Sequence, residues 1–308
     1  PIRGNTRLCK LSRGLGDVYK RQASTHPFSK WVDQKHTEKD RYDQLTDEMQ
    51  GAARRLLICG MHVHVGIEDN ELRIDLMNQL SYFLPHLLAL SCSSPFWLGE
   101  DTGLKSYRLT IFDALPRTGV PERFASWAEY ERHVDILKNA GLIEDSTRVW
   151  WDLRPSGKFP TLETRIMDVC TRLKDTVALA ALLCCIMRML FRLRTRNQRW
   201  RLYTPMLIRE NRWRAMRYSF DEGLIDLARG TVVPFAELMD ELCSLVAEDA
   251  RALGCEKEIK GIHDILTRGT SAHRQSKIYE LERASGASKE DALKSVVDML
   301  IADTATGL

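Results

Sequence analysis

The 308-residue sequence lacks three features that would assign a protein to a special class. Its net charge is only +3, with basic and acidic residues intermixed, which argues against a nucleic-acid partner. Its eight cysteines show no CxxC pair or other metal-cluster spacing. Several of them lie in apolar runs, where free cysteine behaves as a small hydrophobic residue, so we predict a reducing, cytoplasmic setting. Internal repeats and low-complexity stretches are also missing.

The most apolar run, Val177 to Leu193, is not built like a membrane span. A transmembrane helix needs about 20 mostly apolar residues without a central charge. This run is shorter and carries Arg188 near its middle, so we predict a buried core helix and no membrane partner. A hydrophobic content of 44% and a charged content of 28% are typical of a soluble globular protein.

The most informative stretch runs from Cys59 to Ile67 and alternates strictly, which predicts a β-strand because successive side chains point to opposite faces. One face carries His62 and His64, and two imidazoles side by side favour a metal or phosphate site. The alternative is a half-buried strand whose histidines only hydrogen-bond to neighbours. Gly60 and Gly66 bracket the run and would let a ligand or another backbone come close. The apolar face comprises Met61, Val63, Val65 and Ile67.

Hydrophobic periodicity and turn residues predict the other elements. The expected helices cover 43–57, 71–90, 127–140 (ended by Gly141), 177–193, 209–220, 234–254 and the segment from Ser288, whose spacing to Asp291 fits a capping box. The expected strands cover 106–112, 148–154 and 161–167, with Pro155-Ser-Gly157 as the turn between the last two.

The last two strands carry charged residues that would be unfavourable to bury alone: Asp152, Arg154, Glu163 and Arg165. Charges held on a sheet are usually paired with each other or in contact with a ligand. Salt bridges within the sheet and a ligand site are therefore both open interpretations.

The first 23 residues differ from the rest of the sequence, being basic and rich in turn residues without a clear period. The segment from Ser12 to Gln22 is typical of translated adapter sequence, which is set aside from fold reasoning. We predict that residues 1–23 form a non-native or disordered tail without a function of their own.

Seven motifs follow one another between Thr25 and Arg217: Thr25-His-Pro-Phe28, Cys59-Gly-Met-His-Val-His-Val-Gly-Ile67, Ser106-Tyr-Arg108, Phe112-Asp-Ala-Leu-Pro-Arg-Thr-Gly119, Trp150-Trp-Asp-Leu-Arg-Pro-Ser156, Pro160-Thr-Leu-Glu-Thr-Arg165 and Asn211-Arg-Trp-Arg-Ala-Met-Arg217. Together they resemble the bacterial carboxylate–amine ligases, a family also called glutamate–cysteine ligase 2. The resemblance extends from about Ser24 to the C-terminus. It implies an α+β fold with a glutamine synthetase-like antiparallel sheet packed with helices.

The resemblance also implies roles for individual residues. His62 and His64 match a Gly-Met-His-x-His strand of glutamine synthetases, in which the first histidine binds a metal and the second approaches the nucleotide. Glu163 and Arg165 match a Glu-x-Arg strand whose glutamate binds that metal and whose arginine meets the transferring phosphate. Phosphate or substrate-carboxylate binding is implied for a further set: Arg108, Arg154, Asn211 and Arg217.

The implied reaction uses ATP to join a carboxylate, such as that of glutamate, to an amine, such as that of cysteine. A carboxylate is a poor acylating agent, so ATP first forms an acyl phosphate, which the amine then attacks without a covalent enzyme intermediate. Phosphoryl transfer needs charge neutralisation by arginine and by metals. One histidine among carboxylates suits Mg2+ or Mn2+ better than zinc.

The sequence departs from the family pattern at its beginning. Family members begin with a glutamate-rich strand, further sheet and another acidic segment, which have no counterpart before His26. We therefore expect residues 24–308 to be a partial catalytic domain without the N-terminal strands, weakly active or inactive. Exposed sheet edges would invite association, for example as a homodimer.

Two other classes of function stay open. A metal-dependent amidohydrolase also uses His-x-His on a strand, but it would need further histidines at strand ends. The remaining candidates fall in predicted helices or loops: His86, His133, His263 and His273. A non-catalytic binding module that keeps the fold is the second class, and metal-dependent ATP binding without turnover would favour it.

Overall fold

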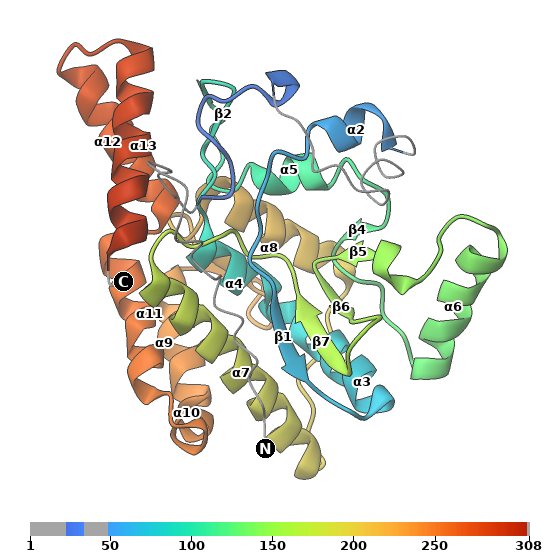
Figure 1. Ribbon diagram of the computed structural model, residues 1–308. Coiled ribbons are helices and arrows are strands. Elements are labelled where there is room, and N and C mark those ends of the chain that lie inside the picture. The colour runs from blue at the N-terminus through green and yellow to red at the C-terminus, as the bar shows by residue number, and fades with distance from the viewer. Residues whose placement is uncertain (1–22, 34–48, 307–308) are drawn as a thin grey trace.

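The computed structural model describes residues 23–33 and 49–306. Its central element is a small antiparallel sheet of three strands in the order β1-β7-β6. These strands are β1 (Val63–Gly66), β7 (Thr161–Thr164) and β6 (Leu153–Pro155). Figure 1 shows the sheet in the middle of the molecule with helices around it. The predicted tail at 1–23 lies almost wholly outside the described residues.

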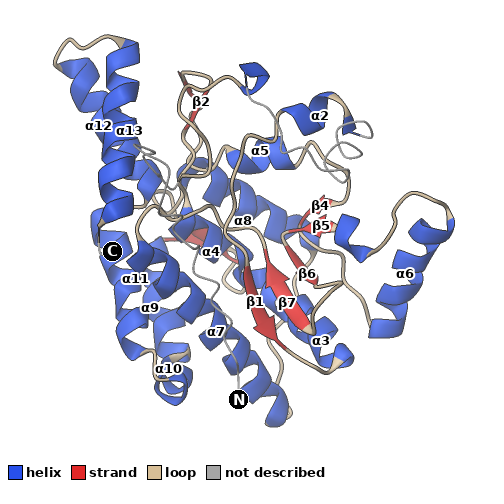
Figure 2. Ribbon diagram, viewed as in Figure 1, coloured by secondary structure: helices blue, strands red, loops and turns tan. Residues whose placement is uncertain are grey.

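Helices make up most of the described chain, as Figure 2 shows. The longer ones are α3 (Asn70–Leu80), α4 (Leu84–Ser91), α6 (Trp127–Asn139), α7 (Leu173–Thr195), α8 (Pro205–Tyr218), α9 (Phe235–Leu245), α11 (Glu256–Arg268), α12 (Ser271–Ala284) and α13 (Lys289–Ala305). Shorter helices are α2 (Gly51–Arg54), α5 (Arg108–Phe112) and α10 (Ala247–Leu253). The short strands pair as β2 (Phe96–Trp97) with β3 (Glu100–Asp101), β4 (Thr118–Gly119) with β5 (Trp150–Trp151), and β8 (Leu224–Asp226) with β9 (Thr231–Val233).

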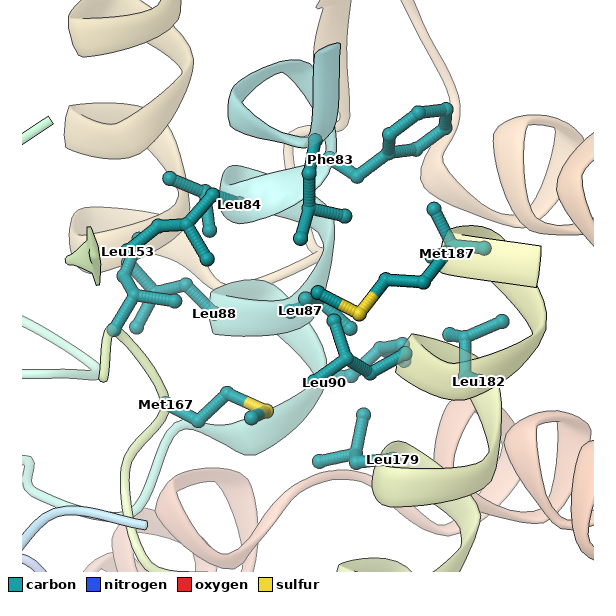
Figure 3. Close-up of a cluster of buried hydrophobic side chains, with 14 of the residues drawn as sticks. Phe83, Leu84, Leu87, Leu88, Leu90, Leu153, Met167, Leu179, Leu182 and Met187 are labelled. Atoms are coloured by element: carbon teal, nitrogen blue, oxygen red, sulfur yellow. The ribbon is translucent and has the colours of Figure 1, made fainter. Parts of the chain in front are cut away.

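The main hydrophobic core forms where α7 packs against α3, α4, α10 and α11. Figure 3 shows Leu87 and Leu90 of α4 facing Leu182 and Met187 of α7, with Leu153 of β6 at the side of the cluster. All five side chains are buried. Burying an aliphatic side chain of this size contributes roughly 1.5–3 kcal/mol. This core holds the inner face of the sheet in place and leaves the opposite face open for polar residues.

The predicted core helix at 177–193 is confirmed and slightly longer. Within the described residues, α7 is the one helix whose length and composition would let it cross a membrane, and half of its apolar window is buried. Arg188 and Arg192 bind the buried carboxylate of Asp249 at 2.5 and 2.7 Å. The arginines that interrupt the apolar run therefore pair with a neighbouring helix.

Several helix ends agree with the sequence signals. Gly141, with φ of +70°, follows α6 as predicted, and the Ser288 side chain accepts the backbone N–H of Asp291 at the start of α13. The predicted helix at 71–90 is interrupted by a 3-10 turn at 81–83 before Pro85. The predicted helix at 234–254 is broken at Val246 into α9 and α10. Part of the predicted helix at 43–57 lies outside the described residues, and in the rest only Met49 and α2 are helical.

One predicted strand, 106–112, is wrong, because Arg108–Phe112 forms the helix α5. Its buried residues are Arg108, Leu109 and Ile111, a helical spacing rather than an alternating one. So short an apolar pattern fits one helical turn as well as a strand. The helix also turns Arg108 inward, where it finds a buried carboxylate.

The other two predicted strands are shorter than expected. The 148–154 segment is divided at Asp152, whose carbonyl accepts the N–H groups of both Arg165 and Ile166. This local bulge ends the regular pairing, so β7 stops at Thr164. The predicted turn at 155–157 is confirmed as the link between β6 and β7.

His86 lies in α4 among aromatic rings and predicts a pH-dependent stability. Its ring centroid is 5.3 Å from that of Tyr82 and 6.2 Å from that of Phe235, and the side chain is buried. Burial lowers the pKa of the imidazole from an ordinary value near 6.5 to about 4. As the pH falls below 6.5, the His86 imidazole is therefore protonated in the unfolded chain but stays neutral in the folded chain until about pH 4.

We expect the free energy of unfolding to decrease between pH 6.5 and pH 4, by about 3 kcal/mol from this group. Urea unfolding at a series of pH values measures this decrease. A His86→Phe variant should lose most of the slope above pH 4.5, where the carboxylates are still ionised. An unchanged slope in that variant would contradict the assignment.

Candidate functional site

The open face of the sheet brings the predicted histidine and glutamate motifs together. In the strand register, Glu163 on the central strand lies opposite His64 on β1 and opposite Arg154 on β6. Side chains directly opposite in neighbouring strands share a face. The alternation of β1 is confirmed, since His62 and His64 are about 40% exposed while Val65 and Ile67 are buried.

Glu163 is the centre of this cluster. Its Oε2 accepts the Nε–H of Arg154 at 2.8 Å, and its Oε1 accepts the Nη1–H of Arg165 at 2.7 Å. Its Oε1 also lies 3.1 Å from Nδ1 of His62 and 3.7 Å from Nε2 of His64. Only 5% of the Glu163 side chain is exposed. Burial alone would raise its pKa, but the hydrogen bond from His62 and the charges of the two arginines hold it well below its usual range.

The two arginines are fixed from several sides. Arg154 donates to the carbonyl of Thr147 at 2.9 Å and to that of Val149. Arg165 lies over the ring of Phe112, 5.8 Å from its centroid. Burial, reinforced by the charge of Arg154, lowers the pKa of Arg165. Two guanidinium groups around one carboxylate leave an excess of positive charge, which suits an anionic ligand such as a phosphate.

The two histidines face this arginine pair. Nδ1 of His64 lies 2.9 Å from Oγ1 of Thr161, and Nδ1 of His62 lies 3.5 Å from Nη1 of Arg165. Burial, together with the charge of Arg165, outweighs the hydrogen bond to Glu163 and lowers the pKa of His62. Both rings are therefore held by neighbours and still half exposed, as a ligand site requires.

The cluster does not offer a metal centre by itself. Both oxygens of Glu163 are already bound to arginines, and no three or more His, Cys, Asp or Glu side chains within 23–33 and 49–306 are arranged so that they could hold a metal ion. A divalent cation prefers several oxygen ligands and would here face two positive guanidinium groups. The predicted metal role of His62 and Glu163 therefore does not fit the described residues alone.

Arg108, predicted to bind phosphate or substrate, is buried one layer deeper. Its Nε donates to Oδ1 of Asp168 at 2.7 Å, and its Nη2 donates to the carbonyl of Ile166. Gly60 allows this close approach, because a Cβ atom there would lie 2.8 Å from Nη1 of Arg108. Gly66, in contrast, has nothing within 4 Å of such an atom. The close approach at Gly60 is thus that of a side chain, not that of the ligand or second backbone expected from the sequence.

The structure does not bring Asn211 and Arg217 to the cluster. The Asn211 side chain binds both backbone groups of Ile225, at 2.8 and 2.7 Å, and so holds β8 against α8. Arg217 donates to the carbonyl of Gly103 and lies over the ring of Tyr218, 5.0 Å from its centroid. Neither contact involves the sheet face.

Two buried aspartates were not among the predicted site residues although they support the site. Asp168 binds Arg108, and Asp152 binds Arg212 at 2.7 Å. Arg212 also binds Asp113 at 2.7 Å, which links α8, α5 and the bulge beside Arg165. The charged pattern at 148–154 pointed to Asp152, but its partner Arg212 is distant in sequence, so no local pattern revealed the pair. Asp168 follows the predicted strand at 161–167 and was therefore not part of its charged pattern.

The histidines required by an amidohydrolase lie elsewhere in the described chain. His86 is buried in α4, His133 binds the carbonyl of Glu129 in α6, and His273 binds Asp221 from α12. His263 lies on α11 near Asp240, 3.8 Å away. These positions do not assemble a second set of ligands around His62 and His64.

Comparison with known proteins gives consistent matches. The family model described as "Glutamate-cysteine ligase family 2" matches residues 21–298. A protein of Rhodospirillum rubrum named "Putative glutamate–cysteine ligase 2" is 62% identical over 301 residues, which are 98% of this chain and 77% of that protein. A protein of the same name from Jannaschia sp. is 57% identical over 98% of this chain and 79% of its own length.

A solved structure is similar in fold. The crystal structure of a glutamate–cysteine ligase from Francisella tularensis in complex with AMP aligns with a TM-score of 0.58, covering 93% of this chain and 73% of that chain. The sequence identity is 12%, so this likeness concerns the fold. It confirms the predicted α+β class, in which helices pack with small and mostly antiparallel sheets.

Proposed function

Because this chain belongs to glutamate–cysteine ligase family 2, a family of ATP-dependent ligases that form C–N bonds, we propose that the open sheet face binds the phosphates of ATP. The observation that carries the proposal is the pair of guanidinium groups, Arg154 and Arg165, held by the one buried carboxylate of Glu163. The proposed substrates are an amino-acid carboxylate such as that of glutamate and an amine such as that of cysteine.

The proposed reaction has two steps. An oxygen of the substrate carboxylate attacks the γ-phosphorus of ATP, the bond to the bridging oxygen breaks, and ADP leaves. The amine nitrogen then attacks the acyl carbon, phosphate departs, and the nitrogen loses a proton. Negative charge develops on the transferring phosphoryl group in the first step, and positioned arginines stabilise it.

Each side chain of the cluster has a proposed part in these steps. Arg165 contacts the transferring phosphoryl group, and Arg154, bound to the carbonyls of Thr147 and Val149, holds a phosphate or the substrate carboxylate. His64 approaches the nucleotide from β1. Glu163 keeps both guanidinium groups in position, since it binds each of them within 2.8 Å. His62 closes the cluster on the β1 side.

Magnesium or manganese is the cation that the family resemblance implies. The described residues supply one carboxylate to the cluster, already bound to two arginines, so none of the proposed steps is assigned to a metal.

We propose an indirect role for Arg108, because it binds the carbonyl of Ile166 and so fixes the segment that follows Arg165. Contact of Asn211 or Arg217 with a ligand has no support in their positions. Cytoplasmic location and a homodimer remain predictions from the sequence.

The proposal is tested by nucleotide binding and by ADP release from the purified chain. We expect ATP to bind, and ADP release to require a carboxylate substrate such as glutamate, with hydroxylamine trapping the acyl phosphate as a hydroxamate. Both quantities are needed, because binding and turnover together distinguish an active ligase from a non-catalytic module. ATP binding without any ADP release would favour the non-catalytic module, and absence of ATP binding would contradict the proposal.

A further inference from the structure

A cavity lies at the end of the sheet where β6 turns into β7, apart from the cluster on the open sheet face. It has a volume of about 420 Å3 and is enclosed by the first turn of α3, by α6 and by the β6–β7 turn. In Figure 1, α6 stands at the right-hand edge of the molecule, with α3 and the strands to its left. Small-molecule sites typically have volumes of 300–1,000 Å3. Its walls include Asn70, Arg73, Trp127, Tyr130, Ser146 and Lys158.

Arg73 is the unusual residue of this cavity. Only 7% of it is exposed, and its guanidinium lies over the ring of Trp127, 4.7 Å from the centroid. It donates to the side-chain oxygen of Asn70, and its Nε has no hydrogen-bond partner. Within the described part of the chain no carboxylate lies within ion-pair distance of it. Burial lowers the pKa of this arginine, against the smaller opposing effects of Tyr130 and of Asp69, the N-cap residue of α3.

The comparably buried arginines of this protein are paired. Arg108 binds Asp168, and Arg212 binds both Asp113 and Asp152. A buried charge without a partner is unfavourable, so it is usually compensated by an ion pair or by a ligand. Arg73 lacks the ion pair and lines a cavity, which makes a ligand carboxylate the fitting partner.

The cavity also offers negative charge for the other end of such a ligand. Glu131 and Asp135 of α6 and Asp145 of the following loop line it, together with the exposed Lys138, which binds Asp135 at 3.0 Å. Charges of both signs around one small cavity suit a zwitterion. An α-amino acid carries one carboxylate and one ammonium group only a few bonds apart.

We propose that this cavity binds a free α-amino acid, with the carboxylate on Arg73 and the ammonium group on the acidic residues of α6. The site is distinct from the sheet face proposed to bind phosphate, so binding is tested independently of that face; only the kinetic test of its role rests on the proposed function. The two are adjacent through one segment of chain. Ser146 lines the cavity, and the next residue, Thr147, holds Arg154 through its carbonyl.

Binding is measured by calorimetry and by thermal shift on the full chain without nucleotide. The probes are L-glutamate and L-2-aminobutyrate, each compared with its α-carboxamide, which lacks the α-carboxylate. We expect the acids to bind and the amides to bind at least about tenfold more weakly. Arg73→Met should weaken binding of the acids by about 10- to 100-fold, whereas Arg73→Lys should retain part of it. Arg132→Met, an exposed arginine on α6 outside the cavity lining, is the matched control.

The melting temperature separates ligand binding from a structural role. If the role of Arg73 is to bind a ligand, the ligand-free Arg73→Met variant should melt at or above the melting temperature of the wild type, because an uncompensated buried charge has been removed. A melting temperature lowered by several degrees, with the ligand-induced shift retained, would overturn the proposal. Absence of binding by both acids would overturn it as well.

The role of the bound amino acid is distinguished by kinetics. If it is the acceptor amine, Arg73→Met raises KM for the amine with little change in kcat. If it is an effector, the amino acid changes the rate without being consumed, and Arg73→Met abolishes that response. Failure of the proposed function would be a separate result. Arg165→Met should leave amino-acid binding here unchanged whether or not the sheet face binds ATP.

Discussion

Replacing Arg165 with methionine is expected to lower the rate of acyl-phosphate formation by about 10²- to 10³-fold, the usual effect of removing one positioned donor to a developing charge. Folding stability should change little. Glu163 keeps its hydrogen bond to Arg154 at 2.8 Å and its contact with His62 at 3.1 Å, so the substitution leaves no buried charge without a partner. The change therefore separates the chemistry of the site from its architecture.

The rate is measured in single-turnover experiments with enzyme in excess over ATP, which resolve even slow catalysis. Arg251→Met, an exposed arginine on α10, is the matched control and should retain the rate of the wild type. Arg165→Lys should fall between the two, because it keeps the charge but loses the planar fork. A rate within threefold of the wild type in Arg165→Met would mean that Arg165 serves only as an ion-pair partner of Glu163.

Local signals in the sequence were sufficient to place His62 and His64 on one strand face and Glu163 and Arg165 on another strand, but not to bring the two strands together. Alternation assigns the two histidines to one face of a strand. A second alternating run after a Pro-Ser-Gly turn forms a hairpin, and this puts Arg154 beside Glu163. What the sequence did not contain was the pairing of β1 with β7, which joins residues about 100 positions apart. The family resemblance supplied that link.

The remaining predicted residues show where local patterns stop being informative. Arg108 was assigned to a strand that is a helix, and its partner Asp168 lies 60 residues further along the chain. Asn211 and Arg217 share a motif on α8 with Arg212, but a helix points successive residues in different directions. Only Arg212 turns toward the bulge beside the site, where it meets Asp152. Which face of α8 is buried depends on packing against distant elements.

The predicted boundaries of the strand at 148–154 were wrong for a related reason. The run at 148–154 alternates throughout, yet the backbone leaves the ladder at Asp152 because its carbonyl accepts two N–H groups of the facing segment. The buried side chain of Asp152 then requires a cation, and Arg212 supplies it from α8. The local sequence would have continued the strand through Asp152, but the strand is interrupted there, where the tertiary ion pair with Arg212 forms.

The second large effect is expected at Asp168, which we predict to stabilise the fold rather than to take part in the chemistry. Its carboxylate is fully buried and accepts from the backbone N–H of Ser93 at 2.9 Å, from the hydroxyls of Ser94 and Ser106 at 2.8 and 2.9 Å, and from Arg108. Asp168→Ala removes these bonds and leaves Arg108 buried without its counter-charge. Breaking such a pair on one side destabilises a protein by about 3–5 kcal/mol.

Urea unfolding followed by far-ultraviolet circular dichroism measures this loss, and Asp298→Ala on the exposed side of α13 is the control, expected to change stability by less than about 0.5 kcal/mol. The double variant Arg108→Met with Asp168→Ala should recover part of the loss, because the stranded charge is then also removed. A loss below about 1 kcal/mol in Asp168→Ala would mean that Arg108 is compensated in another way. Arg108 would then again be a candidate ligand-binding residue, because its ion pair with Asp168 is the reason for assigning it a structural role.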